Sequence, residues 1–168
     1  MIKSSFLFLL SLLWVACSGC SSYQLGSTYD PGFKTIFIEN FKSEVDEPML
    51  ENLVTTTVIK QFQKDGTFQV TDLAQADVIL KGRITSFSMS PVRFSRANEL
   101  TPTEASMAIE VKYVLIKRNE TKSYFEGQAT GDTSFFIGND LQSDKRQGIP
   151  LVAEKLGSHI VSALADGW

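Results

Sequence analysis

One long stretch of this chain alternates hydrophobic and polar positions with the period of two that is typical of β-strands. Residues 107–118 show the pattern clearly, because apolar side chains there alternate with Ala108, Glu110 and Lys112. Such a strand has one buried face and one wetter face. Four further segments rich in β-branched and aromatic residues also predict strands, at residues 34–40, 68–71, 78–89 and about 123–136.

Two other segments repeat their apolar side chains at the spacing of one helix face. In the first, Asp46 is the expected N-cap, Pro48 lies near the first helical position and Gly66 is the expected C′ residue. The second spans about residues 144–166. Each buried apolar side chain contributes roughly 1.5–3 kcal/mol, so both stripes are predicted to pack on the sheet. The stripes comprise Met49, Leu50, Leu53, Val54, Val58, Ile59 and Phe62, and then Ile149, Val152, Ala153, Leu156, Ile160 and Leu164.

The order of these elements, β-α-β-β-β-β-α, predicts an α+β fold. We expect a two-layer sandwich, in which a mostly antiparallel sheet of four or five strands has two helices packed on one face. A single domain of roughly 150 residues buries about 70% of its unfolded surface, so it needs neither disulfides nor a metal ion to fold.

The first twenty residues have the pattern of an export signal. Lys3 is followed by an apolar run from Phe6 to Ala16 and then by small residues that end at Cys20. The run is shorter than the about 20 residues that a membrane-spanning helix needs. We therefore predict a lipoprotein signal peptide at residues 1–19, an acylated N-terminus and flexible tether at residues 20–32, and one periplasmic α+β domain at residues 33–168.

Ser18-Gly19-Cys20 resembles the lipobox of bacterial lipoproteins. The resemblance implies cleavage before Cys20 and acyl chains, such as palmitate, on its sulfur and amino group. Cys17 is the alternative acylated residue, although the bulky Trp14 would then stand three positions upstream. Two or three acyl chains hold a protein firmly on a membrane, where one binds only reversibly. Because Ser21 stands where inner-membrane lipoproteins often have Asp, the resemblance implies the outer membrane.

Composition and charge exclude several classes of function. Acidic residues outnumber basic ones by 19 to 16 and no run of Lys or Arg occurs, so nothing indicates binding to nucleic acid. His159 is the single histidine, and neither a cysteine of the mature chain nor a Gly-rich phosphate loop accompanies it. We therefore expect no catalytic residues, no metal site, no cofactor and no enzymatic activity.

Three stretches give the chain a resemblance to the LptE family. They are Tyr23-Gln24-Leu25-Gly26 just after the signal, a strand that ends in Asn40-Phe41, and the segment ADVILKGRI at residues 76–84. The resemblance covers nearly the whole mature chain in element order. It implies a non-enzymatic outer-membrane lipoprotein that plugs the β-barrel LptD, assists its folding and contacts lipopolysaccharide during transport to the cell surface. The alternative is a different periplasmic lipoprotein that assembles an envelope or secretion complex through a small α/β binding domain.

Two segments are candidates for binding. Arg93, Phe94 and Arg96 follow a long predicted strand. Arginine binds phosphate through its planar fork and a neighbouring Phe can lie along an acyl chain, which suits a phosphorylated glycolipid; a solvated strand end is the simpler interpretation. Phe135 and Phe136 are adjacent in a strand and must point to opposite faces, so one of them lies outside the core unless a partner covers it.

Overall fold

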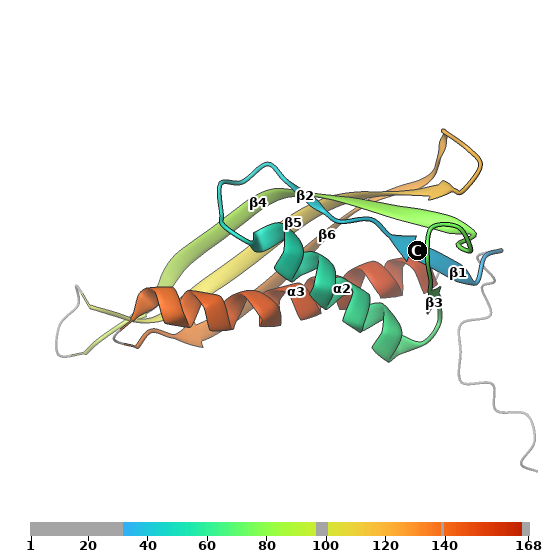
Figure 1. The fold of residues 1–168 in the computed structure, drawn as a ribbon. Coiled ribbons are helices and arrows are strands. Elements are labelled where there is room, and N and C mark those ends of the chain that lie inside the picture. The colour runs from blue at the N-terminus through green and yellow to red at the C-terminus, as the bar shows by residue number, and fades with distance from the viewer. Residues whose placement is uncertain (1–31, 97–100, 139, 166–168) are drawn as a thin grey trace, which may run out of the picture.

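The computed structural model describes residues 32–96, 101–138 and 140–165 of the chain. Figure 1 shows a long, curved sheet with two helices on one side of it. The strands are β1 (Thr35–Ile38), β2 (Lys42–Ser43), β3 (Gln69–Val70), β4 (Val78–Phe94), β5 (Pro102–Lys117) and β6 (Ser123–Phe136). The helices are α2 (Leu50–Asp65) and α3 (Leu141–Ala165).

The sheet is mixed, with the strand order β3-β1-β4-β5-β6, and β2 also pairs with β4. The α+β class and the two helices are confirmed, whereas a mostly antiparallel sheet of four or five strands is wrong. β4, β5 and β6 are antiparallel, but β1 is parallel to β3 and β4, and β2 is parallel to β4. A parallel pair needs a long crossover, and the segment that contains α2 supplies it between β1 and β4.

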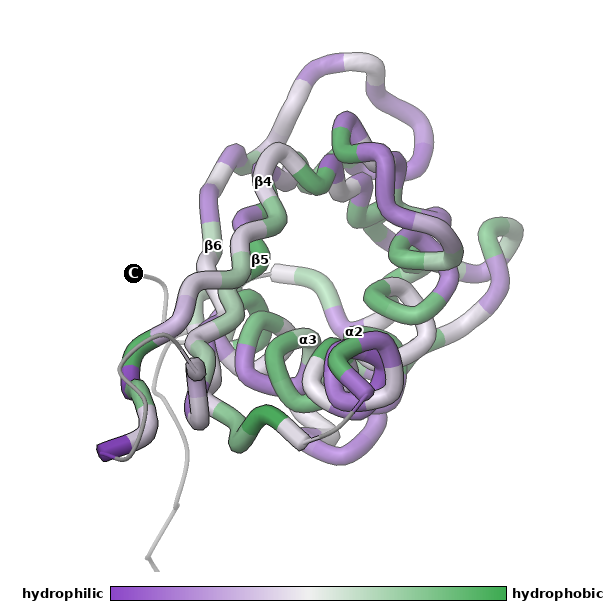
Figure 2. The backbone as a smooth tube through the Cα atoms, turned by 90° about the vertical axis from the view of Figure 1, so that its left-hand side faces the viewer, coloured by the Kyte–Doolittle hydropathy of each residue, from purple (hydrophilic) through white to green (hydrophobic). Residues whose placement is uncertain are grey.

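The two helices lie side by side under the long strands, as Figure 2 shows in a second view. α3 packs against β5 and β6, and α2 packs on α3 and approaches β2 and β3. The core lies between these layers. Its buried residues include Leu50, Val54, Val58 and Phe62 of α2, Val152, Ala153, Leu156 and Ile160 of α3, and Ile36, Leu80, Ile84, Met107, Ile109, Val111 and Leu115 of the sheet.

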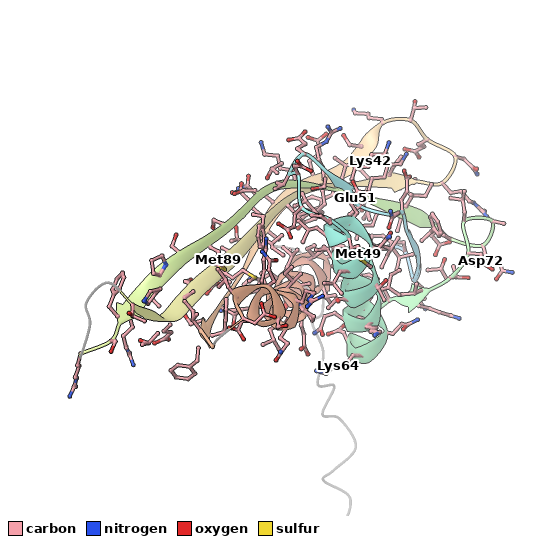
Figure 3. The ribbon with its side chains drawn as sticks, turned by 60° about the vertical axis from the view of Figure 1, so that its left-hand side comes forward. Lys42, Met49, Glu51, Lys64, Asp72 and Met89 are labelled. Atoms are coloured by element: carbon pink, nitrogen blue, oxygen red, sulfur yellow. The ribbon has the colours of Figure 1, made fainter. Side chains whose placement is uncertain are left out.

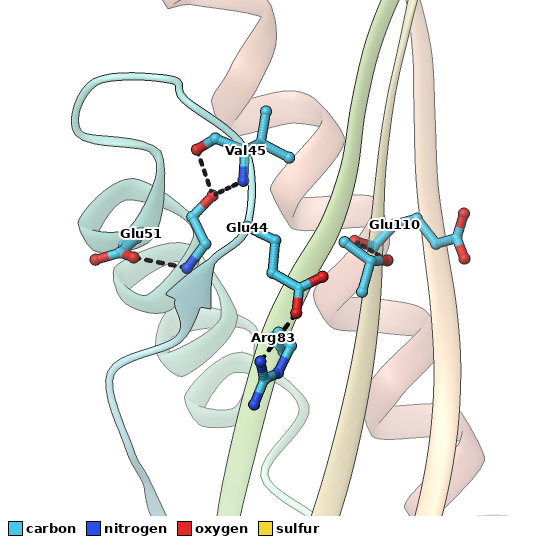
Figure 4. Close-up of polar contacts among 7 residues, drawn as sticks. Glu44, Val45, Glu51, Arg83 and Glu110 are labelled. Atoms are coloured by element: carbon cyan, nitrogen blue, oxygen red, sulfur yellow. Dashed lines mark hydrogen bonds and ion pairs between the residues drawn. The ribbon is translucent and has the colours of Figure 1, made fainter.

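Helix α2 begins later than the sequence predicted. Its N-cap position is occupied by Met49, which has a left-handed backbone (φ 63°) and no side-chain cap, so Asp46 is not the N-cap. The first-turn acid Glu51 instead accepts a hydrogen bond from the backbone N–H of Ser43 at 2.6 Å, which ties α2 to β2 (Figure 4). At the other end the predicted Gly66 is confirmed as the cap, because it is left-handed and its N–H donates to the Phe62 carbonyl at 3.1 Å.

Helix α3 begins at Leu141, three residues before the predicted Asp144, because Asp140 caps it. One Asp140 oxygen accepts the N–H of Gln142 at 3.0 Å and the other accepts the Ser143 hydroxyl at 2.6 Å. These hydrogen bonds, the one from the Ser143 hydroxyl above all, lower the pKa of the Asp140 carboxyl. An Asp at this position satisfies N–H groups that the first helical turn leaves unpaired.

The segment at residues 76–84 holds the parallel part of the sheet in register. Asp77 Oδ2 accepts hydrogen bonds from the backbone N–H groups of Lys34 (3.1 Å) and Thr35 (3.0 Å) at the start of β1. The Thr35 backbone makes the largest contribution to lowering the pKa of the Asp77 carboxyl. Gly82 lies against the ring of Phe41, where a Cβ would come within 2.5 Å of a ring carbon. Both residues therefore have architectural roles.

Candidate functional site

The three long strands reach one end of the molecule together, and we call the surface there the distal end: Val92, Arg93, Phe94, Arg96, Phe136 and Leu141. Arg93 is in register with Glu104 on β5, and Glu104 is in register with Phe136 on β6. The strand ends remain paired, since the Thr103 hydroxyl donates to the Arg93 carbonyl at 3.3 Å and the Ile137 N–H donates to the Thr103 carbonyl at 3.0 Å. Residues 97–100, which follow Arg96, lie outside the described part of the chain.

Apolar side chains are exposed at the distal end. Phe136 is 76% exposed, Val92 53%, Phe94 46% and Leu141 41%. They come from β4, β6 and the start of α3, which meet at the left of Figure 1. Exposed apolar side chains that gather in one place mark binding surfaces more often than single ones do. The distal end therefore has the character of a site that another molecule covers.

The two predicted arginines differ in their surroundings. Arg93 Nε lies 3.4 Å from Glu104 Oε2, and Glu104 is the less exposed partner of this ion pair. Arg96 is exposed at the end of the described strand, and no described carboxylate pairs with it. A phosphate group at the distal end would therefore meet one arginine directly and would compete with Glu104 for the other.

The neighbouring phenylalanines face opposite sides of β6, which confirms the prediction. Phe135 is half-buried and packs against the core, whereas Phe136 points away from it. The connection that follows is fixed to α3, because the Gly138 N–H donates to Asp144 Oδ2 at 2.6 Å. Phe136 and Leu141 are thereby held on the same end of the fold, which the sequence pattern did not indicate for Leu141.

A second surface feature, which the sequence did not predict, is a groove of about 870 Å³ between the first turns of α2 and α3. Met49, Leu53 and Ile149 line it together with Glu47 and Lys145. Met49 was predicted to be buried in the α2 stripe but is 79% exposed, because the helix begins only after it (Figure 3). Its left-handed backbone is uncommon for a residue other than glycine and stores strain.

Two charged residues that line this groove form an ion pair. Lys145 Nζ lies 2.5 Å from Glu47 Oε2, and both side chains are only 18% exposed. The same ammonium group lies 5.1 Å from the centre of the Phe87 ring, which adds a cation–π contact. The pair joins the segment before α2 to α3 and forms part of the lining of the groove.

The remaining features considered in the sequence are the single histidine, a possible metal site, a membrane-spanning helix and the two cysteines. His159 is exposed on α3, and its Nδ1 lies 2.7 Å from the carbonyl oxygen of Thr130 on β6. Among residues 32–96, 101–138 and 140–165, no group of three or more His, Cys, Asp or Glu side chains is placed to hold a metal ion. None of the described helices is both long enough and apolar enough to cross a membrane. Cys17 and Cys20 lie outside the described residues.

These features define a small α+β domain with exposed apolar surface at one end and a groove between its helices. The model of the LptE lipopolysaccharide-assembly family matches residues 33–164, and the chain belongs to this family. No curated protein sequence matches the chain.

Solved structures of the same fold come from several bacteria. A protein of Xanthomonas campestris aligns with a TM-score of 0.58 at 8% identity, over 86% of this chain and 89% of that one. A minor lipoprotein from Acinetobacter baumannii aligns with a TM-score of 0.52 at 12% identity, over 81% and 95%. The PelC dodecamer from Paraburkholderia phytofirmans aligns with a TM-score of 0.52 at 14% identity, over 83% of this chain and 92% of that one. At these identities the likeness shows the shared fold alone.

Proposed function

We propose that this chain is an outer-membrane lipoprotein that acts as the assembly partner and plug of an LptD-type β-barrel in lipopolysaccharide transport. The observation that carries the proposal is the family match over residues 33–164, which spans nearly the whole described domain. The role is structural and not enzymatic. A partner that sits inside a barrel needs a rigid domain with surfaces that the barrel covers, and the mixed sheet with its two packed helices supplies such a domain.

The membrane anchor in this proposal is Cys20, with Cys17 as the alternative. Acyl chains on the cysteine hold the chain on the inner leaflet of the outer membrane, and residues 20–32 serve as the tether. The intact mass of protein extracted from membranes should then correspond to a chain that starts at Cys20 and carries fatty acyl groups. A soluble, unmodified chain with a different first residue would contradict this part of the proposal.

The distal end is the surface proposed to meet lipopolysaccharide. Arg93 and Arg96 supply guanidinium groups for lipid phosphates, and Phe94 supplies an aromatic ring beside them. The exposed Val92, Phe136 and Leu141 extend this apolar surface onto the neighbouring elements. Charge and apolar area side by side match the chemistry of a phosphorylated glycolipid better than either feature alone.

Purification from outer membranes tests the barrel partnership. A tagged, acylated chain should bring down one large β-barrel in a one-to-one ratio, and depletion of the chain should lower the amount of assembled barrel and disturb lipopolysaccharide export. A barrel that assembles normally without this chain would overturn the proposal.

The second candidate is assembly of another envelope or secretion complex. The likeness to a PelC dodecamer favours testing it, since that protein has the same fold and assembles from twelve copies. The same purification separates the two candidates: a ring of many copies of this chain, without a barrel, would support the second.

A further inference from the structure

Three cations stand in one row across the outer face of the sheet, on the side away from the helices. Lys42 on β2 is in register with Arg83 on β4, and Arg83 is in register with Lys112 on β5. Side chains in register on neighbouring strands point to the same face. All three are exposed, while the next residues Ile84 and Val111 are buried in the core.

This arrangement opposes folding. Like charges that stand directly opposite each other on neighbouring strands destabilise a sheet. The row contains two such pairs, Lys42 with Arg83 and Arg83 with Lys112. The chain as a whole has a formal net charge of −3, so a basic composition does not account for three cations in register. Local features that lower the stability of the fold tend to mark functional sites, because a protein keeps such a feature when its function requires it. The use that fits adjacent cations is the binding of an anion.

The carboxylates near the row neutralise it only in part. Glu44 pairs with Arg83 at 2.9 Å (Figure 4). Glu39 pairs with Lys81 at 3.2 Å, and all four side chains are well exposed. Glu110, on the same face of β5, is engaged by the Gln128 amide at 2.5 Å. Across the described segments, no carboxylate pairs with Lys42 or Lys112.

The row also borders a shallow pocket of about 320 Å³. Its lining includes four cations, Lys42, Lys81, Arg83 and Lys112, and a single carboxylate, Glu39. Neighbouring strands lie about 4.8 Å apart, so the row spans roughly 10 Å. A pocket of this size and charge accommodates one or two phosphate groups on a sugar-sized molecule.

We propose that Lys42, Lys81, Arg83 and Lys112 form a phosphate-binding site on the outer face of the sheet. Arg83 presents its planar fork to phosphate oxygens in competition with Glu44, which lies 2.9 Å from it, and the lysines on either side add charge. Arg93 of the distal end lies ten residues further along β4, roughly 33 Å away at about 3.3 Å per residue. The site is therefore separate from the distal end and goes beyond the proposed function. The phosphate belongs either to a lipid headgroup or to a free phosphate compound.

The test compares the Lys42→Gln/Lys112→Gln double variant with the control Lys60→Gln/Lys122→Gln, both in the full chain. The control removes the same charge from exposed lysines outside the row. Without ligand, the row variant should melt about 1–3 °C above wild type, because the repulsion is relieved, whereas the control should not. The affinity of the row variant for inorganic pyrophosphate, measured by calorimetry, should be at least tenfold lower than that of wild type. The affinity of the control should stay within twofold of wild type.

Two further variants separate the site from a mere charge effect. Lys112→Gln alone should show a smaller gain in melting temperature and a smaller loss of affinity. Arg83→Lys keeps the charge but loses the fork, so it should bind pyrophosphate several-fold more weakly than wild type while its circular dichroism is unchanged.

The source of the phosphate is found with micelles of intact and of dephosphorylated lipopolysaccharide. If the row variant binds intact lipopolysaccharide more weakly than wild type but binds the dephosphorylated form equally well, the phosphate belongs to a lipid headgroup. If the row variant loses affinity for pyrophosphate alone, the ligand is a free phosphate compound. Either result supports the site. Equal pyrophosphate affinity of wild type and row variant would overturn it. So would wild-type binding of an acidic peptide without binding of pyrophosphate, since the row would then be a protein interface. Failure of the barrel partnership would leave these results unaffected.

Discussion

Gly131 on β6 faces the main chain of α3 at Val152. A Cβ added at Gly131 would lie 2.8 Å from the Leu156 Cβ and closer still to the Val152 carbonyl oxygen. Real Cβ atoms do not approach a backbone so closely, so only glycine lets the helix lie directly on this strand. Because α3 covers β5 and β6 through this contact, the glycine sets the spacing between the two layers of the fold.

The substitution Gly131→Ala should therefore destabilise the domain by about 1–3 kcal/mol, the usual cost of overpacking a core. Urea unfolding followed by circular dichroism measures the change. Gly138→Ala is the matched control, since its Cβ would lie 3.4 Å from the nearest atoms, an ordinary contact distance. Equal stability of the two variants would show that α3 shifts without cost.

Met49 offers a change in the opposite direction. Its φ of 63° suits glycine, and its side chain is 79% exposed, so little burial is lost on removal. Met49→Gly should stabilise the domain by about 0.5–1 kcal/mol, because the strain at the start of α2 is relieved. Within the helix that follows, the substitution Gln63→Gly should instead destabilise the domain by about 0.5 kcal/mol. A loss of stability in Met49→Gly would indicate that this side chain packs in the groove.

Asp77 should make stability depend on acid pH. The hydrogen bonds from the backbone and side chain of Thr35 hold the pKa of its carboxyl below the usual 3.8. A carboxyl whose pKa is lowered in the folded state stabilises that state at pH values above the pKa of the unfolded chain. This contribution is lost as the pH falls through the lowered pKa of the folded state. Asp77→Asn should thus be less stable than wild type at pH 7, and the difference should shrink below about pH 4.

The control for this pH dependence is Asp46→Asn. Asp46 is exposed, and the observed start of α2 gives it no capping role. Its substitution should leave the melting temperature and its pH profile close to wild type. Parallel profiles for wild type and Asp77→Asn between pH 2 and pH 7 would contradict the role assigned to the Asp77 carboxylate.

Local signals in the sequence predicted much of the fold. The strand at residues 123–136 has the predicted bounds, and Gly66 ends α2 as expected, because both depend on patterns within a few residues. The parallel pairing of β1 could not be predicted in this way, since it depends on where the chain returns after α2. β2 is only two residues long and has no period to detect.

The candidate sites were predictable to different degrees. Arg93, Phe94 and Arg96 stood out because charge and aromatic character follow the predicted strand at residues 78–89; β4 in fact continues to Phe94, so Arg93 and Phe94 lie in the strand and not after it. The pairing of Arg93 with Glu104, eleven positions later, depends on the register of the hairpin. The groove beside Met49 depends on the packing of two helices that are far apart in the sequence. The row of Lys42, Arg83 and Lys112 likewise forms only when three strands align.

Glu104 should restrain phosphate binding at the distal end, because it holds Arg93 at 3.4 Å. Glu104→Gln removes the competing charge and keeps a similar shape. Its affinity for lipopolysaccharide should rise severalfold in a fluorescence titration at low ionic strength, and the gain should fade as salt screens the charges. The control is Glu120→Gln, an exposed acid in the turn before β6. An equal gain in the control would point to net charge and not to release of Arg93.

Replacement of both distal arginines tests the proposed contact with lipopolysaccharide most directly. Charge-assisted hydrogen bonds contribute about 1.5–3 kcal/mol each, so Arg93→Glu/Arg96→Glu should weaken lipopolysaccharide binding by at least tenfold. Folding should be retained, because both side chains are exposed. Arg93→Lys/Arg96→Lys should keep part of the affinity, since the charge remains and the planar fork is lost. Unchanged binding in the double Glu variant, with a native circular dichroism spectrum, would reduce the distal end to a solvated strand end.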